Sequence, residues 1–241
     1  MIVRCILVCL WGAFTAQHQY RLFGNSSVGH FYLKARVGTP PQSQKLVLNT
    51  NVPKVVLLCA DWLQRLTVPS SLFFDRQQST SYKPLNQDTA AVNSIECNSL
   101  TTNNTCAFTE RASDDLLFQG ELGEDQFEML GVPEESSGER LLLAFGCDTT
   151  DASLNDQPLK RPTFGLSMID AGGSFFANLF GQSQGPQTNS SLFVKLCISN
   201  NGGVLGFEDQ LANPQGRAFE AVQTDAVSKR GYLNLRRIKV G

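Results

Sequence analysis

The feature that most constrains the fold is a series of short segments with alternating apolar and polar residues, each followed by a turn sequence. Residues 31–37 alternate in this way, with Phe, Leu, Ala and Val at every second position, which is the period of a half-buried strand. The turn residues 38–41 (Gly-Thr-Pro-Pro) follow, and a second strand is predicted over 45–48. Helical patterns are limited to 60–66 and 174–180. Further strand candidates are 55–58, 116–127, 141–145, 192–198, 204–207 and 232–240. Many short strands between Gly, Pro and Asn turns predict an all-β sandwich or barrel.

The N-terminal segment has the layout of a secretory signal peptide. Arg4 precedes an apolar run over 5–14, and small residues at 12, 13 and 16 offer a cleavage region. A buried N-terminal strand is the alternative. No other stretch approaches the ~18 apolar residues of a membrane span, so no membrane anchor is expected within this chain. The sequence therefore predicts a signal peptide over 1–16 and a mature protein of the secretory pathway, secreted or endolysosomal/vacuolar.

Composition and charge exclude several classes of function. Apolar residues make up 41% and charged residues 17% of the 241 positions, which is enough apolar material for a buried core. The formal net charge is −2 and no basic run is present, so nucleic acid binding is not expected. Metal binding is not expected either, because the chain has no Cys-x-x-Cys spacing and only two histidines, His18 and His30. No cofactor is predicted.

The cysteines favour an oxidising compartment. Five remain after the signal segment, which allows two disulfides and leaves one thiol over. Cys97 and Cys106 bracket a polar loop and are expected to form a local disulfide. Cys147 and Cys197 each end an apolar strand-like run and are expected to pair across the fold. Cys59 is then without a partner.

Three Asn-x-Ser/Thr sequences lie in polar, turn-rich stretches where a glycan can be accommodated. Their asparagines are Asn25, Asn103 and Asn189. Together with the signal segment, they predict a secreted glycoprotein.

One hexamer carries the strongest indication of chemistry. Residues 46–51 read Leu-Val-Leu-Asn-Thr-Asn, whereas a pepsin-like aspartic protease has three apolar residues followed by Asp-Thr-Gly. Other segments resemble that family in the same order, beginning with Phe31–Gln42 (the first strand and turn) and Phe74–Tyr82 (the Ser/Thr-Tyr segment). Next come Gly120–Asp125 (Gly-x-Leu-x-x-Asp), Ala144–Cys147, Thr163–Leu166 and Asn201–Phe207. The chain resembles the N-terminal lobe of an A1-type, pepsin-family aspartic protease, closest to the cysteine-rich plant-type and protozoan branches.

The resemblance implies an all-β, pepsin-like N-terminal lobe over residues 17–230. Residues 231–241 resemble the start of the segment that leads to the second lobe, so the second lobe is expected to be missing or only begun. A single lobe leaves apolar surface uncovered, and a homo-oligomer formed through that face is therefore expected.

The departures from the family fall at positions of chemistry. Asn49 stands at the position of the first catalytic Asp, Thr50 matches the family, and Asn51 replaces a Gly. Counting back from Gly120, the tyrosine position of the flap falls on Ala112, while Asp114 matches the family's Asp. An aspartic protease needs two carboxylates that share a proton, and an amide cannot take a proton from water near neutral pH.

The resemblance implies an aspartic endopeptidase, and the substitutions predict that catalysis is lost. The main hypothesis is a pseudoprotease that binds a peptide or protein ligand in its cleft, although the sequence leaves the enzyme assignment open. A truncated or misannotated gene product of an active secreted aspartic endopeptidase is one alternative. A secreted structural or inhibitor-like module is the other.

Overall fold

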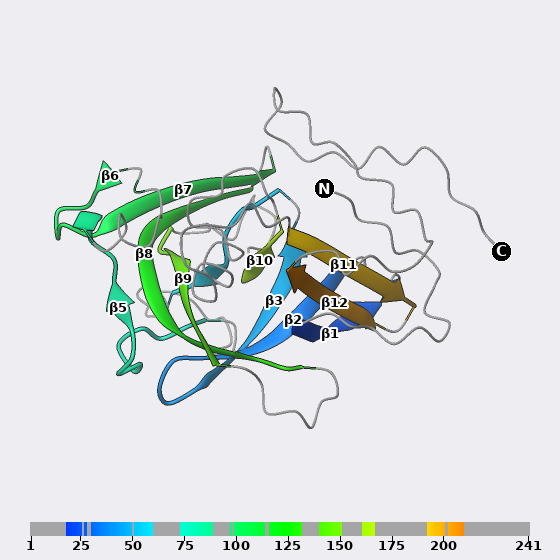
Figure 1. The fold of residues 1–241 in the computed structure, drawn as a ribbon. Coiled ribbons are helices and arrows are strands. Elements are labelled where there is room, and N and C mark those ends of the chain that lie inside the picture. The colour runs from blue at the N-terminus through cyan, green and yellow to red at the C-terminus, as the bar shows by residue number, and fades with distance from the viewer. Residues whose placement is uncertain are drawn as a thin grey trace.

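The elements of the structure are strands joined into one mixed sheet (Figure 1). The computed structural model describes residues 18–25, 27, 30–49, 51–59, 73–88, 97, 99–113, 116–131, 140–150, 161–166, 192–200 and 202–209. Within these residues the strands are β1 (His18–Asn25), β2 (His30–Val37), β3 (Gln42–Asn49), β4 (Val56–Leu58), β5 (Lys83–Pro84), β6 (Ser99–Leu100), β7 (Cys106–Ser113), β8 (Leu116–Met129), β9 (Arg140–Asp148), β10 (Thr163–Gly165), β11 (Leu192–Ser199) and β12 (Gly202–Asp209). The predicted all-β class is confirmed. The predicted signal segment 1–16, the helical patterns at 60–66 and 174–180, and residues 231–241 lie outside the described residues.

The alternating pattern that opens the sequence forms the β2–β3 hairpin. The two strands pair antiparallel, from Tyr32 opposite Val47 to Val37 opposite Gln42. Leu33, Ala35 and Val37 are buried on β2 as predicted, whereas Phe31 is only partly buried, and the residues between them are partly or fully exposed. Gly38 begins the turn at φ +83°, and a Cβ there would lie 2.5 Å from the Ser79 hydroxyl. A residue without a side chain is therefore required at this turn.

A closed barrel is formed by six of the strands. They follow the order β2-β3-β10-β4-β9-β8, and β8 returns to β2 through the pairing of Val37 with Phe127. Two contacts in this circuit are parallel, β3 with β10 and β4 with β9, and both join segments far apart in the sequence. Closure removes free edges from this part of the sheet. The long, curved β8 is visible in Figure 1 wrapping one side of the barrel.

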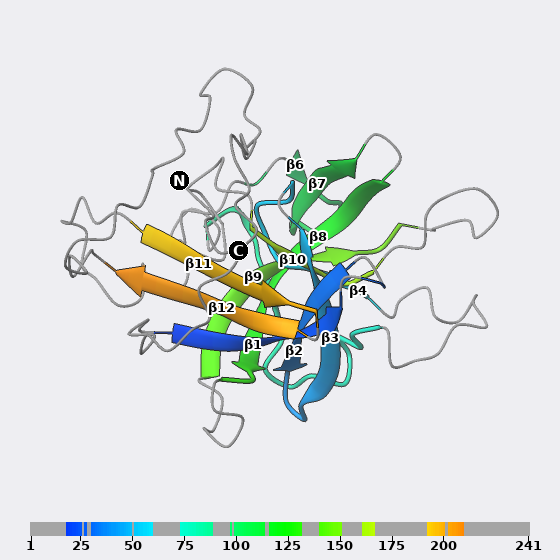
Figure 2. The same cartoon turned by 90° about the vertical axis from the view of Figure 1, so that its right-hand side faces the viewer.

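Strand β1 connects this barrel to a second group of strands. Its first half pairs with β12, from His18 opposite Phe207 to Leu22 opposite Gly203, and its second half pairs with β2. Strands β11 and β12 form a hairpin, so β11, β12 and β1 lie side by side (Figure 2). The sheet thus passes from the barrel into an extension that ends at β11.

The buried apolar residues form two clusters. The first lies within the barrel and centres on Phe145, whose ring contacts Phe74 and Phe127 edge-on at centroid distances of 5.6 and 5.5 Å. The second lies beneath the β7–β8 hairpin and includes Phe108 and Phe118. Burying a side chain of this size contributes about 1.5–3 kcal/mol, so the aromatic residues are major contributors to the stability of the lobe.

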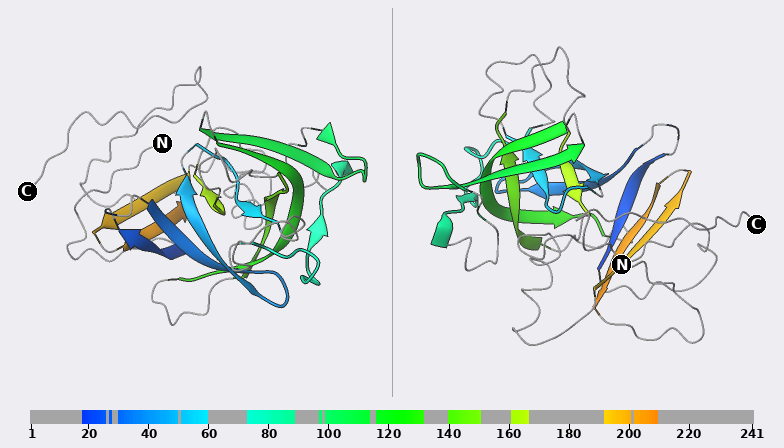
Figure 3. Two further views of the ribbon diagram at one scale, coloured as in Figure 1. Left: turned by 180° about the vertical axis from the view of Figure 1, so that it is seen from behind. Right: turned by 90° about the horizontal axis from the view of Figure 1, so that it is seen from above.

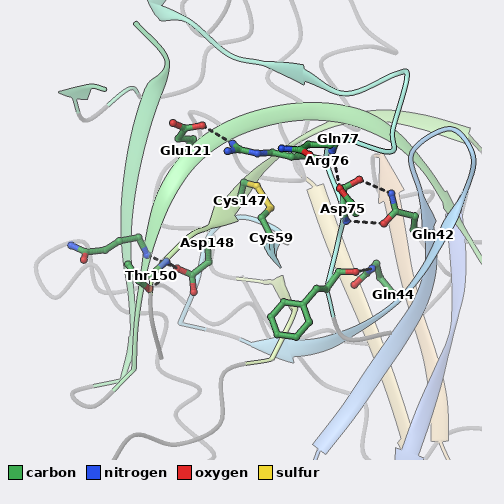
Figure 4. Close-up of a disulfide and its surroundings, with 12 residues drawn as sticks. Gln42, Gln44, Cys59, Asp75, Arg76, Gln77, Glu121, Cys147, Asp148 and Thr150 are labelled. Carbon is green, nitrogen blue, oxygen red and sulfur yellow. Dashed lines mark hydrogen bonds and ion pairs between the residues drawn. A yellow bond between two sulfur atoms is a disulfide. The ribbon is translucent and has the colours of Figure 1, made fainter. Parts of the chain in front are cut away.

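The disulfides correct one prediction from the sequence. Cys97 and Cys106 are bonded, as expected, across a separation of 9 residues. Cys147, however, is bonded to Cys59 and not to Cys197, and the two Cα atoms are 5.5 Å apart (Figure 4). The physical reason is the parallel pairing of β4 with β9, which brings residues 57–59 beside 146–148. Cys197 lies on β11, the first strand in the sheet order, and five strands separate β11 from β4.

Candidate functional site

The candidate site is the loop that follows β3. Strand β3 runs beside the parallel strand β10 (Figures 1 and 3), and Asn49, the last residue of β3, lies opposite Gly165. The backbone amide of Leu166 donates a hydrogen bond to the Asn49 carbonyl at 2.7 Å, and the amide of Val47 donates to the carbonyl of Pro162 at 2.9 Å. The pairing of β3 with β10 therefore fixes the end of β3, and the Asn49 carbonyl is itself one of the bonded groups.

The Asn49 side chain engages the backbone of its own loop. Its Oδ1 atom accepts a hydrogen bond from the backbone amide of Asn51 at 2.8 Å. An Asn that bonds the backbone two residues ahead forms an Asx-turn, which shapes the loop in the way a backbone turn does. The side chain is half-buried and carries no charge at any ordinary pH. It supplies an amide dipole where proteolysis would need a carboxylate.

The chain then returns directly beneath β10. Val52 is fully buried, and a Cβ on Gly165 would lie 2.3 Å from the Val52 carbonyl oxygen and 2.5 Å from that of Lys54. Only glycine permits this approach, because any side chain would displace the backbone of the loop. The contact fixes residues 52–54 against the strand that flanks Asn49.

A nearly buried ion pair joins this loop to the β7–β8 hairpin. The ammonium group of Lys54 donates to the Oε1 atom of Glu110 on β7, and the two side chains are only 9% and 17% exposed. A charged hydrogen bond at this degree of burial is stronger than one in water, and neither partner is easily left unpaired. Lys54 therefore ties the hairpin to the loop that carries Asn49.

The hairpin has an irregularity at the predicted flap position. Arg111 pairs with Leu117 and Ser113 pairs with Leu116, so the register shifts at Ala112. A bulge of this kind bends the strand and redirects the neighbouring side chains. The backbone of Ala112 belongs to β7, but its side chain lies outside the described part of the chain, as do Thr50, Asp114 and the side chain of Cys197.

A second polar cluster holds the base of the barrel. The Gln42 amide and the backbone of Asp75 exchange two hydrogen bonds of 2.8 Å, and Arg76 pairs with Glu121 at 2.7 Å (Figure 4). Burial raises the pKa of Tyr82, although the neighbouring Arg76 opposes that shift. Burial would lower the pKa of Arg76, yet its hydrogen bond to Glu121 and the adjacent Tyr82 raise it overall. This cluster includes Gln42, the first residue of β3, and therefore lies near the opposite end of that strand from Asn49.

Two of the three predicted glycosylation sites lie in described segments. Asn103 is exposed in the turn between β6 and β7, and Asn25 ends β1 with its Oδ1 atom accepting from the Ser27 hydroxyl at 2.7 Å. Asn189 lies outside the described residues. Among the described residues, no group of His, Cys, Asp or Glu is arranged to hold a metal ion. No helix in that part of the chain is long and apolar enough to cross a membrane.

The structure joins Asn49 and Asn51 by a hydrogen bond within one loop and adds two residues, Lys54 and Glu110, that were not predicted from the sequence. Lys54 and Glu110 are 56 positions apart, and no local pattern connects them. One signal was present in the sequence: Lys54 is the only charged residue in the stretch 46–60. A charge in such a stretch indicates a paired, buried group.

Comparison with known proteins identifies the family of most of the chain. The family model described as xylanase inhibitor N-terminal, a domain of the pepsin-like aspartic protease superfamily, matches residues 31–207. The matched region extends from β2 into β12, so it contains the barrel, the loop at Asn49 and the β7–β8 hairpin. None of the curated proteins matches the sequence significantly.

Proposed function

We propose that this chain, which belongs to the xylanase inhibitor N-terminal family of the pepsin-like aspartic protease superfamily, binds peptide or protein segments without cleaving them. Its fold is that of a pepsin-like N-terminal lobe. The proposal makes it a pseudoprotease, in which the position of the first catalytic Asp serves recognition only. Within the superfamily we place it nearest the A1-type proteases of the cysteine-rich plant-type and protozoan branches.

The single observation that carries the proposal is the hydrogen bond from the Asn51 amide to Asn49 Oδ1. In an aspartic protease the two catalytic carboxylates share one proton, and one of them takes a proton from the attacking water. A carboxamide has no basic lone pair near neutral pH, and here its oxygen is already engaged by the loop. General acid–base catalysis contributes typically 10²–10⁴-fold to a rate, and the loss of one member of a coupled pair removes most of that.

The preserved scaffold supports a binding role. The loop is held by β10 and by the close approach at Gly165, and the Lys54–Glu110 pair anchors the β7–β8 hairpin to it. A binding site needs such support, because residues positioned by packing lose little entropy when a ligand docks. We propose that an extended segment binds over the exposed face of the sheet beside Asn49.

A second candidate function rests on the family description itself. That description names an inhibitor, and a pepsin-like lobe that engages a folded enzyme would also lack any need for a catalytic Asp. In that case the ligand is the surface of a folded protein and not an extended segment. The two candidates differ in whether short peptides bind.

We also propose that the protein functions in the secretory pathway, as a secreted or endolysosomal/vacuolar glycoprotein. Two disulfides support this location, because such bonds persist in oxidising compartments. The exposure of Asn103 in a turn supports glycosylation there. Enzymatic deglycosylation of the protein should remove a mass of glycan size, and the mass removed should be one glycan smaller in Asn103→Gln; no loss of mass from the wild-type protein would refute the assignment.

Calorimetric titration of the full chain with pepstatin, a peptide that mimics the transition state, tests the binding role. We expect binding at one site with no peptide cleavage. Asn49→Arg should abolish it, because the longer cationic side chain fills the space beside the loop, whereas Thr102→Arg in the exposed turn should leave it unchanged. Absence of binding to the wild-type chain would refute the peptide-binding proposal and favour the inhibitor-like candidate.

A further inference from the structure

Strands β1, β2 and β3 lie side by side (Figures 2 and 3), and their exposed face carries ordered rows of residues next to Asn49. Phe23, Tyr32 and Val47 are successive cross-strand partners and form one row. Lys34 and Lys45, also direct partners, form the next row. Because side chains alternate between the two faces of a strand, Lys45, Val47 and Asn49 share one face of β3. The lysine row is thus on the same surface as the loop position, four residues along the strand.

The two lysines lie over the aromatic row. The Lys34 ammonium is 3.9 Å from the centroid of the Phe23 ring, and the Lys45 ammonium is 5.7 Å from that of Tyr32. The Phe23 and Tyr32 rings stack at 5.7 Å. An aromatic face attracts a cation through its quadrupole but does not neutralise it, so both ammonium groups remain available to an anion.

Like charges directly opposite each other destabilise a sheet, so the Lys34–Lys45 pair opposes folding. Among the described residues, no carboxylate forms an ion pair with either lysine. Two further cations lie near this face: the Arg21 guanidinium is 5.3 Å from the centroid of the Phe23 ring, and the Arg161 guanidinium is 3.0 Å from His30 Nε2 at the end nearest the loop. This surface is therefore locally cationic in a chain whose formal net charge is −2.

The spacing of the rows defines what an extended ligand would meet. From Asn49 to Lys45 is four residues of strand, or roughly 13 Å at about 3.3 Å per residue. An extended peptide lying along β3 covers the same length with about four of its own residues. A carboxylate at that distance from the residue beside Asn49 would reach both ammonium groups.

We propose that the Lys34–Lys45 pair, on its Phe23–Tyr32 base, is a subsite for acidic side chains, and that the ligand of this protein is an extended segment with Asp or Glu about four residues from the position that contacts Asn49. This inference rests on the proposed peptide-binding function and specifies its ligand. The ligand is an acidic protein segment, because an extended chain can contact the lysine row and the Asn49 loop at the same time.

Matched peptides test the subsite. Two pepstatin-based peptides are made, one extended on each side of the statine unit, with a pair of glutamates centred four residues from that unit. The affinity of each is compared by fluorescence anisotropy with that of its glutamine counterpart. We expect one glutamate peptide to bind about 2- to 25-fold more tightly at low salt, since each exposed ion pair contributes a factor of about 1.4 to 5. The preference should largely vanish at about 0.5 M NaCl, where exposed charges are screened.

The variants assign the effect to the two lysines. The double variant Lys34→Gln/Lys45→Gln should lose the preference for glutamate and keep its affinity for the glutamine peptide. Lys83→Gln, an exposed lysine on β5 at the opposite side of the barrel (Figure 1), should retain the preference.

Four results would overturn the inference. Equal binding of glutamate and glutamine peptides to the wild-type chain refutes the subsite while leaving peptide binding intact. A preference that survives in the double variant places acidic recognition elsewhere. Equal competition by a heparin tetrasaccharide would make the surface a general polyanion site. Failure of every peptide to bind would refute both the subsite and the proposed function.

Discussion

Replacing Lys54 by methionine removes the cation from the nearly buried ion pair that joins the Asn49 loop to the β7–β8 hairpin. Methionine keeps the length and most of the volume of the lysine side chain, so packing against the loop is preserved. Glu110, which is 17% exposed, then loses its partner. The converse change, Glu110→Leu, leaves the 9% exposed ammonium of Lys54 unpaired.

The burial of the pair sets the expected magnitude. Breaking a fully buried ion pair costs about 3–5 kcal/mol, because the remaining charge is desolvated without compensation. Partial exposure of both groups lowers this, and we expect each single variant to lose about 2–3 kcal/mol of unfolding free energy. Glu110→Leu should be the more destabilising, because it strands the more deeply buried charge. The double variant Lys54→Met/Glu110→Leu should lose no more than about 1 kcal/mol, since no charge is left unpaired.

Urea unfolding at pH 7, followed by tryptophan fluorescence, gives the three free energies for a double-mutant cycle. Hydrogen exchange of the β7 and β8 amides measures the local effect. The exchange rates should increase in both single variants and return toward the wild-type rates in the double variant. Additive losses in the double variant, about 4–6 kcal/mol in total, would refute the reasoning. Single variants as stable as the wild type would show that the pair is solvated.

Three further results follow from the structure. Replacing Cys59 and Cys147 by alanine should cost about 4–5 kcal/mol in urea unfolding, because the bond closes a loop of 88 residues; a loss under about 1 kcal/mol would contradict this. Gly165→Ala should destabilise by about 1–3 kcal/mol, through the clash with the Val52 carbonyl, and should weaken pepstatin binding more than an equally destabilising core variant does. Burial raises the pKa of Tyr82 above its ordinary value of 10.0, so above about pH 10 the unfolded chain loses this proton first and stability falls as the pH rises. Tyr82→Phe should flatten that alkaline decline in pH-dependent unfolding, and an unchanged slope would exclude Tyr82 as its cause.

The β2–β3 hairpin shows what the sequence alone could predict. Its alternating pattern, its Gly-Pro turn and the end of β3 at Asn49 are all local features, and the structure has each of them where expected. The local disulfide between Cys97 and Cys106 was predictable for the same reason, because its partners are 9 residues apart. Local periodicity and short loops leave a clear signal in a single sequence.

The features that the sequence did not reveal depend on distant contacts. The Cys59–Cys147 bond follows from the parallel pairing of β4 with β9, and no pattern within either segment specifies that pairing. Strand β7 (Cys106–Ser113) was missed because it carries two charged residues, one of which is neutralised only by Lys54 across the fold. Strand β1 was missed because only Tyr20 and Leu22 mark its buried face, and Phe23 directly after Leu22 breaks the alternation.

The most direct test of the central claim, that Asn49 has replaced a catalytic carboxylate with a recognition element, is a cleavage assay. The full chain is incubated with a diverse peptide library between about pH 3 and 6, with and without pepstatin, and products are identified by mass spectrometry. We predict no pepstatin-sensitive cleavage at any pH, because the amide of Asn49 cannot act as a general base. Cleavage by the wild-type chain that pepstatin abolishes would contradict the account.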